Sequence, residues 1–245
     1  MCFHTSVKDR VIKIEKRFGV TISDTNIVTL FDQPNYHLNG FAHPNMLVIP
    51  QGKPEVLAPG VWGIVPDDNT PETIKPYYKE AVRFGGGLNA QSEKLFSHFV
   101  YKNVALTQRC IIPVSGFFEP HTVGKKKFPF YIHRQDDQLM GLAGIYTVIG
   151  TYITYSILTK KASPLFAEIH NVKNRQPVIL EPSLEQDWLN PELSTTEVME
   201  LIAEPFPDST LETYPVSKEL FSPKVDSNTA DSIKPVQYPE LNTLF

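Results

Sequence analysis

The spacing of hydrophobic positions near the start of the chain predicts one amphipathic helix followed by short strands. In residues 8–18, apolar side chains recur every three or four positions, and Gly19 ends the pattern. The continuous apolar runs at 45–50 and 61–66 are instead typical of short buried strands. A helix therefore precedes the first strands of a sheet.

Proline and glycine punctuate the next part of the chain. Residues 71–80 are polar and interrupted by proline, which indicates a surface loop or a short helix. Three consecutive glycines at 85–87 predict a tight turn. We expect a helix to follow over 88–100, with Phe99 and Val100 on one apolar face.

The second half of the chain alternates apolar runs with polar breaks. Five of these runs predict strands: 110–114, 128–132, 142–146, 152–159 and 176–180. Short helices are expected at 162–170, 184–189 and 195–203, the last after a capping sequence that begins at Ser194. The break at 134–138 is typical of a hairpin turn. This order predicts an α+β fold, a single domain with a curved, barrel-like mixed or antiparallel β-sheet flanked by short helices.

The composition is that of a globular protein. At 245 residues, with 41% hydrophobic and 20% charged positions, the chain fits one large domain and is neither a disordered chain nor a coiled coil. We expect this domain over residues 1–220 and a loop-rich tail over 221–245, packed on the domain or extending from it. No apolar run approaches the ~20 residues that span a bilayer. A charged segment follows the N-terminus, so no signal peptide or membrane contact is expected. Only two cysteines occur, which favours a cytoplasmic protein.

The net charge of −4 argues against a general nucleic-acid-binding protein. The charge is uneven, however. Residues 1–130 contain 15 basic and 11 acidic side chains, whereas residues 131–245 contain 8 basic and 16 acidic ones. A local basic surface built mostly from the first half is therefore compatible with the acidic total. An acidic, loop-rich second half without functional meaning explains the asymmetry equally well.

Cys2 is the most informative single residue. Removal of an initiator methionine is favoured by a small second residue, and it would leave a cysteine whose α-amine and thiol lie on adjacent carbons. The amine, with a reference pKa of ~7.7–8.0, can attack an aldehyde, and the thiol can then close a five-membered thiazolidine. The thiolate can alternatively attack an acyl carbon. A cysteine that lies at position 2 by chance is the competing interpretation.

Two further residues have surroundings suited to proton transfer. Glu119 is flanked by aromatic residues and a proline, so partial desolvation should raise its pKa. His170 lies in a polar, basic loop that leads into an apolar strand. A solvent-facing glutamate and an ordinary surface histidine are the alternatives. Basic side chains that can hold phosphates surround this loop: Lys160, Lys161, Lys173 and Arg175.

Other motifs are absent or weakly informative. Asn89, after the glycine run, offers an amide that can orient a substrate. The sequence has no CxxC, HExxH or acidic calcium loop, so we expect no metal site. The glycine run lacks the spacing of a phosphate-binding or dinucleotide-binding loop, and no cofactor is expected.

The order of these segments closely resembles the SOS response-associated peptidase (SRAP) family over roughly residues 1–220. The resemblance rests on five segments in the same order: Met1-Cys2, Trp62–Pro66, Asn89–Glu93, Arg109–Glu119, and Ala167–His170 with Gln176–Leu180. It implies a single α+β domain with a barrel-like sheet. It also implies a protein that shields abasic sites in single-stranded DNA through a thiazolidine crosslink to the mature N-terminal cysteine, with a self-processing peptidase activity and an abasic-site lyase activity.

The resemblance also implies roles for particular residues. Cys2 would be the nucleophile and crosslinking residue, and Asn89 would position it together with the sugar. Glu119 would assist proton transfer at the amine and Schiff base. His170 would protonate the sugar ring oxygen during opening, or the leaving strand in a lyase step. DNA contacts would come from six residues: Trp62, which would stack on a base, Gln91, Lys160, Lys161, Lys173 and Arg175.

The sequence departs from the family pattern at several positions. Gln91 stands where the family usually has arginine, and Phe3-His4 replaces Gly-Arg after the cysteine. Pro120 replaces a tryptophan after the glutamate, and a longer connection follows His170 before Pro177. These changes affect the expected DNA contacts more than the expected chemistry.

Two other functions remain open from the sequence. An N-terminal-nucleophile cysteine amidohydrolase or glutamine amidotransferase also begins with cysteine after methionine removal, and glutamine-dependent ammonia release would support it. A non-catalytic single-stranded DNA-binding module is the other alternative, and a Cys2→Ala variant that keeps all activity would favour it. For the abasic-site function we expect a monomer whose partner is single-stranded DNA, with nucleoid association when it is bound.

Overall fold

The computed structural model describes residues 2–22 and 24–241. Its strands are β1 (His4–Val7), β2 (Asn35–Asn39), β3 (Asn45–Pro50), β4 (Ala58–Trp62), β5 (Asn89–Gln91), β6 (Arg109–Val114), β7 (Gly116–Val123), β8 (Lys126–Arg134), β9 (Met140–Ile149), β10 (Tyr152–Lys161), β11 (Arg175–Pro177), β12 (Ile179–Leu180) and β13 (Leu211–Pro215). Its α-helices are α1 (Val11–Phe18), α2 (Val28–Phe31), α3 (Pro71–Ala81), α4 (Pro164–Ile169), α5 (Glu185–Trp188) and α6 (Thr195–Ala203). Short 3₁₀ turns join several of these elements.

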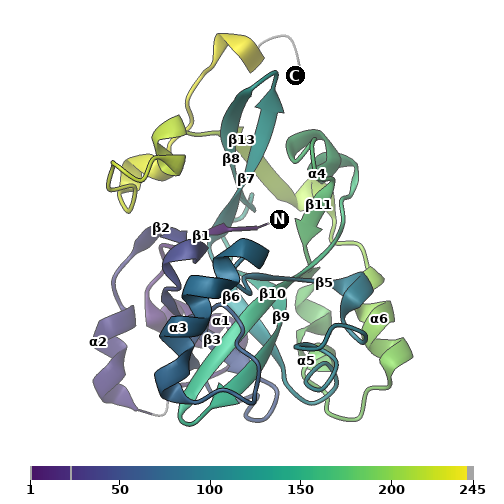
Figure 1. Cartoon of the computed structure of the whole chain (residues 1–245). Coiled ribbons are helices and arrows are strands. Elements are labelled where there is room, and N and C mark those ends of the chain that lie inside the picture. Colours follow the sequence, from purple (N-terminus) through teal and green to yellow (C-terminus); the bar gives the residue numbers. More distant parts are fainter. Residues whose placement is uncertain (1, 23, 242–245) are drawn as a thin grey trace.

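One sheet closes on itself. Strand β10 pairs with β4, β4 with β3, β3 with β6, β6 with β9, and β9 again with β10. Strands β5 and β11 also pair with β10, and β12 pairs with β9. Because β4 and β5 run parallel to β10 while the other pairs are antiparallel, the predicted mixed, barrel-like sheet with short flanking helices is confirmed (Figure 1).

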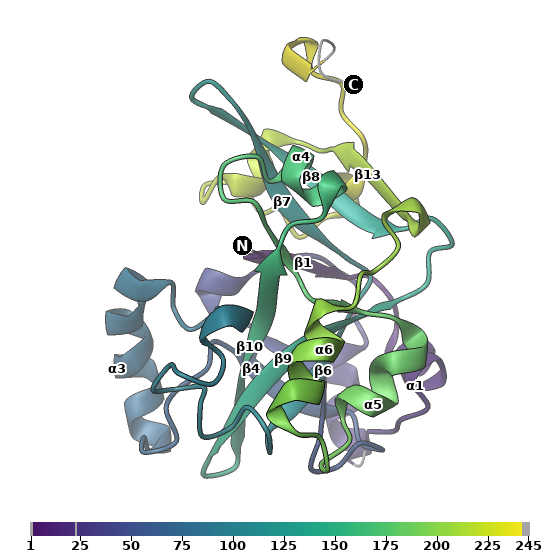
Figure 2. The same cartoon turned by 90° about the vertical axis from the view of Figure 1, so that its right-hand side faces the viewer.

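A second sheet of five antiparallel strands lies above the barrel, in the order β13-β8-β7-β1-β2. In both views the β7–β8 hairpin extends away from the barrel, and β1 lies in the part of the second sheet nearest the barrel (Figures 1 and 2). One apolar cluster fills the barrel side beneath α1, α5 and α6. A second cluster packs where the two sheets meet and includes Cys2 and Trp62. The amino-terminal strand therefore lies at the junction of the two sheets.

Several local predictions are confirmed with small shifts. Helix α1 occupies the predicted amphipathic segment, and Gly19 ends it at φ 68°, the left-handed conformation that glycine tolerates best. Helix α6 begins at the predicted capping box, in which Ser194 and Glu197 each bond the other's backbone N–H. Residues 71–80 form helix α3. The strand expected at 61–66 ends earlier, at Trp62.

The helix predicted over 88–100 is wrong. Residues 89–91 form strand β5, which pairs in parallel with β10, and irregular turns follow it. The glycines before it have φ values of 66–88°, and a Cβ on Gly87 would lie 2.5 Å from the Ile64 carbonyl oxygen. Phe99 is 68% exposed whereas Val100 is buried, so the two do not share an apolar face. Pairing with a neighbouring strand overrides the local helical pattern.

The end of the chain packs on the second sheet. The backbone N–H of Val236 donates to the Pro215 carbonyl, and the Tyr238 hydroxyl donates to the Val216 carbonyl. The division at residue 220 stays a prediction. No helix within residues 2–22 and 24–241 is long and apolar enough to cross a membrane.

Candidate active site

Strand β1 places Cys2 at the junction of the two sheets. The strand is held on both sides, since His4 pairs with Phe118 of β7 and with Asn39 of β2. Cys2 lies two residues before the first residue of this strand and is fully buried. Its Sγ lies 3.8 Å from the His4 carbonyl oxygen. The second residue of the chain is thus part of the packed interior.

Asn89 connects the barrel to this N-terminal segment. Its Nδ2 donates to the Cys2 carbonyl oxygen at 2.8 Å, and its backbone pairs with Ile157 of β10. The three-glycine turn delivers the chain to this position. The Asn89 Oδ1 atom is buried, and within the described part of the chain it has no hydrogen-bond partner. Asn89 therefore fixes Cys2 and also presents a buried acceptor beside it.

Glu119 and His170 form an acid–imidazole pair at the same junction. Glu119 lies in the middle of β7 with no exposed surface. His170 ends α4, a helix that starts at the Ser163 N-cap, and its Nδ1 lies 3.3 Å from Glu119 Oε2. Burial raises the pKa of Glu119 to about 7 and lowers the pKa of His170 to about 4. The carboxyl group therefore titrates near neutrality, and the imidazole is neutral there.

The hydrogen bonds of His170 define its tautomer. Its Nδ1 lies 3.0 Å from the Arg175 carbonyl oxygen, which can only accept a hydrogen bond. Nδ1 of the neutral ring therefore carries the hydrogen, and Nε2 carries the lone pair. In this tautomer His170 can accept a proton at Nε2. Only the imidazolium formed in that way can donate a proton from Nε2.

The Cys2 thiol is held in its protonated form. Burial raises the pKa of Cys2 well above its ordinary value, and the charge of Glu119 raises it further. A reaction at sulfur therefore needs proton removal during attack, and Glu119 is placed beside it.

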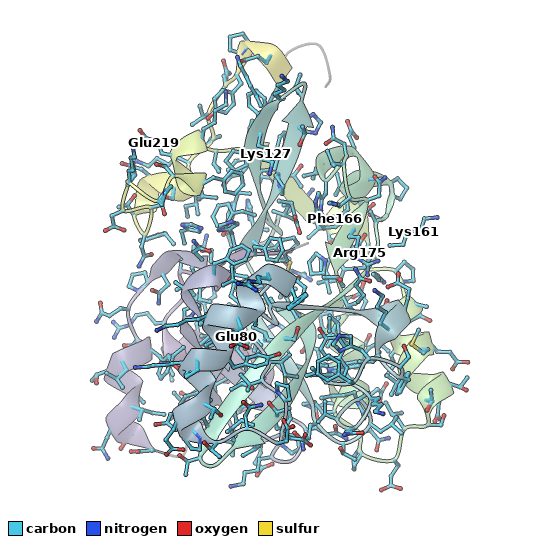
Figure 3. The ribbon with its side chains drawn as sticks, viewed as in Figure 1. Glu80, Lys127, Lys161, Phe166, Arg175 and Glu219 are labelled. Atoms are coloured by element: carbon cyan, nitrogen blue, oxygen red, sulfur yellow. The ribbon has the colours of Figure 1, made fainter. Side chains whose placement is uncertain are left out.

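A cavity of about 500 Å³ opens at this junction. Its lining combines aromatic rings with imidazole and ammonium groups: Phe3, His4, Phe41, Phe118, Phe221, Lys127, His170 and Lys173, with Asn39 and Pro120. Figure 3 shows Lys127 on the hairpin above the junction and Arg175 to one side of it. Of these lining residues, only His170 and Lys173 were predicted as site residues. His4 could have been found from its spacing, because residues two apart in an extended segment share a face with Cys2.

Comparison with known proteins identifies the family of the chain. The family model for SOS response associated peptidase (SRAP) matches residues 1–223. The chain belongs to the SRAP family. It is 28% identical over 219 residues to the abasic site processing protein YoqW of Bacillus subtilis, covering 86% of this chain and 92% of that protein. It is 29% identical over 154 residues to the abasic site processing protein YedK of Escherichia coli, covering 61% and 67%. A crystal structure of a Bacteroides thetaiotaomicron protein superposes with a TM-score of 0.83 at 27% identity, covering 96% of this chain and all of that one.

The predicted catalytic residues of this SRAP chain are brought together. Asn89 bonds the Cys2 backbone, Glu119 influences the Cys2 thiol, and His170 contacts Glu119. They come from four separate segments of the sequence. Their assigned roles in catalysis stay predictions.

The prediction that Trp62 stacks on a DNA base is corrected by the structure. Trp62 has no exposed surface, and its Nε1 donates to the Leu88 carbonyl oxygen at 2.9 Å. A Cβ on Gly40 would touch both the Trp62 ring and the Phe3 carbonyl oxygen. Trp62 therefore packs beneath the N-terminal segment, where it supports the site from inside the core.

The other predicted DNA-contact residues fall into different surroundings. Lys173 is exposed and lines the cavity at the junction. Lys160 donates to the carbonyl oxygens of Ile202 and Glu204 at the end of α6, and Arg175 forms a bidentate ion pair with Glu93. Lys161 is exposed beside a second cavity of about 390 Å³, and Gln91 is half-buried in β5. Only Lys173 of this predicted set lines the cavity at the junction.

Proposed function

We propose that this protein processes abasic sites in single-stranded DNA by capturing the sugar aldehyde covalently through a mature N-terminal Cys2. The observation that carries the proposal is the grouping of Cys2, Asn89, Glu119 and His170 beside a cavity with cationic lining. Relatives that align with most of this chain are named abasic site processing proteins, which supports the same substrate. Every residue in the grouping belongs to one chain, so a monomer would suffice.

The chemistry begins once Met1 is removed, either by an aminopeptidase or by self-processing. The α-amine of Cys2 attacks the aldehyde carbon of the open-chain sugar and forms a carbinolamine. Loss of water gives an imine. The Cys2 sulfur then adds to the imine carbon, and the thiol proton ends on the ring nitrogen. The product is a thiazolidine, and the net reaction releases one water molecule.

Glu119 would move protons between these steps. With a pKa near 7 it exists in both protonation states at neutral pH. Its carboxylate would accept a proton from the attacking amine, and the resulting acid would protonate the departing hydroxyl group. The carboxylate would then draw the proton from the Cys2 thiol as sulfur attacks. Burial among aromatic rings therefore suits Glu119 to both directions of transfer.

His170 would open the sugar ring. An abasic sugar is mostly a cyclic hemiacetal, and opening it requires a proton to leave the hydroxyl group and another to reach the ring oxygen. The Nε2 lone pair of neutral His170 would take the first proton, and the imidazolium would return it to the ring oxygen, stabilised by Glu119. At the imine stage the same imidazole can assist strand cleavage by β-elimination, which would account for a lyase activity.

The DNA strand would enter the cavity at the junction. Lys127 and Lys173 line it and would contact phosphates, so affinity should fall as salt rises. Aromatic rings at the cavity offer stacking surfaces for unpaired bases. These features favour single-stranded DNA and backbone contacts over the recognition of base edges.

A denaturing crosslinking assay tests the proposal. Purified protein is incubated with a single-stranded oligonucleotide that carries one abasic site, then heated and resolved by gel electrophoresis. We expect a heat-stable adduct with the natural protein and none with Cys2→Ser. The matched control is Cys110→Ala, which removes the other buried cysteine and should leave the adduct intact. Equal adduct from Cys2→Ser, or none from the natural protein, would overturn the proposal.

A further inference from the structure

A chain of hydrogen bonds runs from the cavity to the C-terminal segment. His4 Nδ1 lies 2.9 Å from His37 Nε2, and His37 Nδ1 lies 2.6 Å from Ser227 Oγ. His4 lines the cavity two residues after Cys2, whereas Ser227 lies 223 positions after His4 in the sequence. The C-terminal segment around Ser227 is thus connected to the lining of the cavity by two imidazole rings.

The C-terminal segment is fixed firmly enough to act on these rings. The Asn228 side-chain oxygen accepts hydrogen bonds from the backbone N–H groups of Tyr36 and His37. The Phe221 ring lies 5.1 Å from the His4 ring. Ser227 and Asn228 lie beyond residue 223, where the match to the family model ends. This contact is therefore made by a part of the chain that the family model does not include.

Both imidazoles are neutral at neutral pH. Burial lowers the pKa of His4 to about 3 and that of His37 to about 4. A neutral imidazole has one donor and one acceptor nitrogen. One hydrogen therefore lies between His4 Nδ1 and His37 Nε2, and its position determines both tautomers. The hydrogen bonds between Ser227, His37 and His4 can therefore run in either of two directions. In one direction His4 presents an N–H donor to the cavity, and in the other it presents an acceptor nitrogen.

In the first arrangement, the Ser227 hydroxyl donates to His37 Nδ1, and His37 Nε2–H donates to His4 Nδ1. His4 then carries its hydrogen on Nε2. In the second arrangement, every hydrogen bond is reversed, and His4 Nε2 becomes an acceptor. Because Nδ1 of His4 is engaged by His37, Nε2 is the ring nitrogen that remains for the cavity.

We infer that the Ser227 hydroxyl donates to His37 Nδ1 and thereby holds His4 in the tautomer that presents an N–H group to the bound strand. This inference rests on the proposed function. The phosphodiester and sugar-ring oxygens of DNA accept hydrogen bonds and do not donate them, so only the first arrangement gives a productive contact. His4 touches the substrate, whereas His37 and Ser227 are positioning residues that act through it.

The tautomer can be measured without DNA. Nitrogen-15 NMR of histidine-labelled protein near neutral pH distinguishes a protonated Nε2 from a protonated Nδ1. We expect His4 to carry its hydrogen on Nε2 in the natural protein and to show a mixed population in Ser227→Ala. Ser222→Ala is the matched control, because Ser222 lies in the same segment and bonds only the Lys224 backbone N–H among the side-chain hydrogen bonds of the described residues. A natural protein with His4 protonated on Nδ1 would overturn the inference.

The effect on reaction is measured by single-turnover crosslinking at saturating DNA. Ser227→Ala should slow the reaction about three- to tenfold, the usual range for one hydrogen bond. Ser227→Thr keeps the hydroxyl group and should restore the rate, which a packing role alone would not require. The double variant His37→Phe/Ser227→Ala should be no slower than His37→Phe, since Ser227 acts through His37.

The NMR measurement and the crosslinking rates together distinguish a failure of this inference from a failure of the proposed function. If the natural protein forms no adduct, the proposed function fails and the strand contact of His4 fails with it. If the natural protein forms the adduct and Ser227→Ala reacts at the same rate with unchanged His4 nitrogen shifts, this inference alone is overturned. A slower Ser227→Ala reaction that Ser227→Thr restores supports it.

Discussion

Strand β6 of the barrel and the segment that leads into β1 each place one cysteine in the cluster where the two sheets meet, and the comparison separates structure from chemistry. Cys110 lies in β6 of the closed barrel, and burial raises its pKa. Cys2 enters the five-stranded sheet through β1, and burial raises its pKa likewise. Only Cys2 has a near-neutral carboxyl group beside it and an amide from the other sheet on its backbone. Burial in this cluster therefore does not by itself make a reactive cysteine, and the neighbours of Cys2 supply what those of Cys110 lack.

The two buried glutamates sharpen the same contrast. Glu185 lies in α5 on the barrel side and forms a bidentate ion pair with Arg17, at 2.8 and 2.9 Å. Glu119 lies beside a neutral histidine and a thiol. The first has the surroundings of a structural ion pair, and the second has those of a proton carrier.

The largest expected effect is on the rate of crosslinking. Glu119→Gln should slow single-turnover crosslinking about 100-fold near pH 7, a typical loss when a general acid–base group is removed. In the natural protein the rate should rise as pH increases through about 7, because Glu119 ionises there. The Glu119→Gln variant should show no such rise in rate near pH 7. Glu185→Gln should leave the rate unchanged, and an equal loss in both variants would remove the distinction between the two sites.

The same pair of variants predicts stability effects of different size. The folded-state pKa of Glu119, about 7, lies above its ordinary value of 4.5. Folding therefore favours the protonated acid, and stability falls as pH rises from 4.5 to 7. Glu119→Gln should then be more stable than the natural protein above pH 7, by on the order of 3 kcal/mol, with little difference at pH 4.

Glu185→Gln should change stability at neutral pH by less, because burial raises the pKa of Glu185 whereas the ion pair with Arg17 lowers it. Urea unfolding of the three proteins at pH 4 and pH 8 gives both differences. A Glu119→Gln protein that is destabilised at pH 8 would mean that the ionised carboxylate is stabilised by its surroundings, contrary to the assignment.

An element of the fold could be predicted from the sequence when the residues that define it are neighbours along the chain. Helix α1 was predicted correctly because Gly19, which ends it, directly follows its apolar pattern. The start of α6 was predicted correctly because the capping residue Ser194 directly precedes the helix. The strand that carries Asn89 was missed, since a three-residue strand is defined by its partner β10 and not by its own side chains.

The site followed the same rule. Cys2, Glu119 and His170 could be selected by residue type and by family resemblance, but only the fold shows that they meet. The sequence did not reveal that Trp62 is buried, since a tryptophan near a glycine suits a core or a surface equally well. Nor could the sequence connect His4 to Ser227, because the two residues are linked only through His37 and lie far apart in the sequence.

A smaller effect is expected from the barrel's own contribution to the site. Asn89→Ala removes the hydrogen bond to the Cys2 carbonyl and should slow crosslinking about tenfold, with little change in DNA affinity. Asn69→Ala, at a half-buried position just before α3, is the matched control and should react normally. If Asn89→Ala reacts at the natural rate, the barrel does not position the nucleophile.

The smallest expected effect distinguishes two lysines. Lys173→Ala should weaken DNA binding a few-fold and reduce the slope of log affinity against log salt by about 1, because one phosphate contact is lost. Lys160→Ala should leave DNA binding unchanged, since Lys160 already bonds the carbonyl groups at the end of α6. Fluorescence anisotropy at several salt concentrations measures both, and equal slopes for the two variants would place the strand elsewhere.

The central claim is that the junction of the two sheets turns Cys2 into an aldehyde-capturing group, and intact mass spectrometry tests it most directly. The protein is weighed before and after incubation with a single-stranded oligonucleotide that carries one abasic site. We expect the protein to lack Met1, and the adduct to weigh the sum of protein and oligonucleotide less one water. A chain that retains Met1, or a processed chain that gains no mass, would contradict the account.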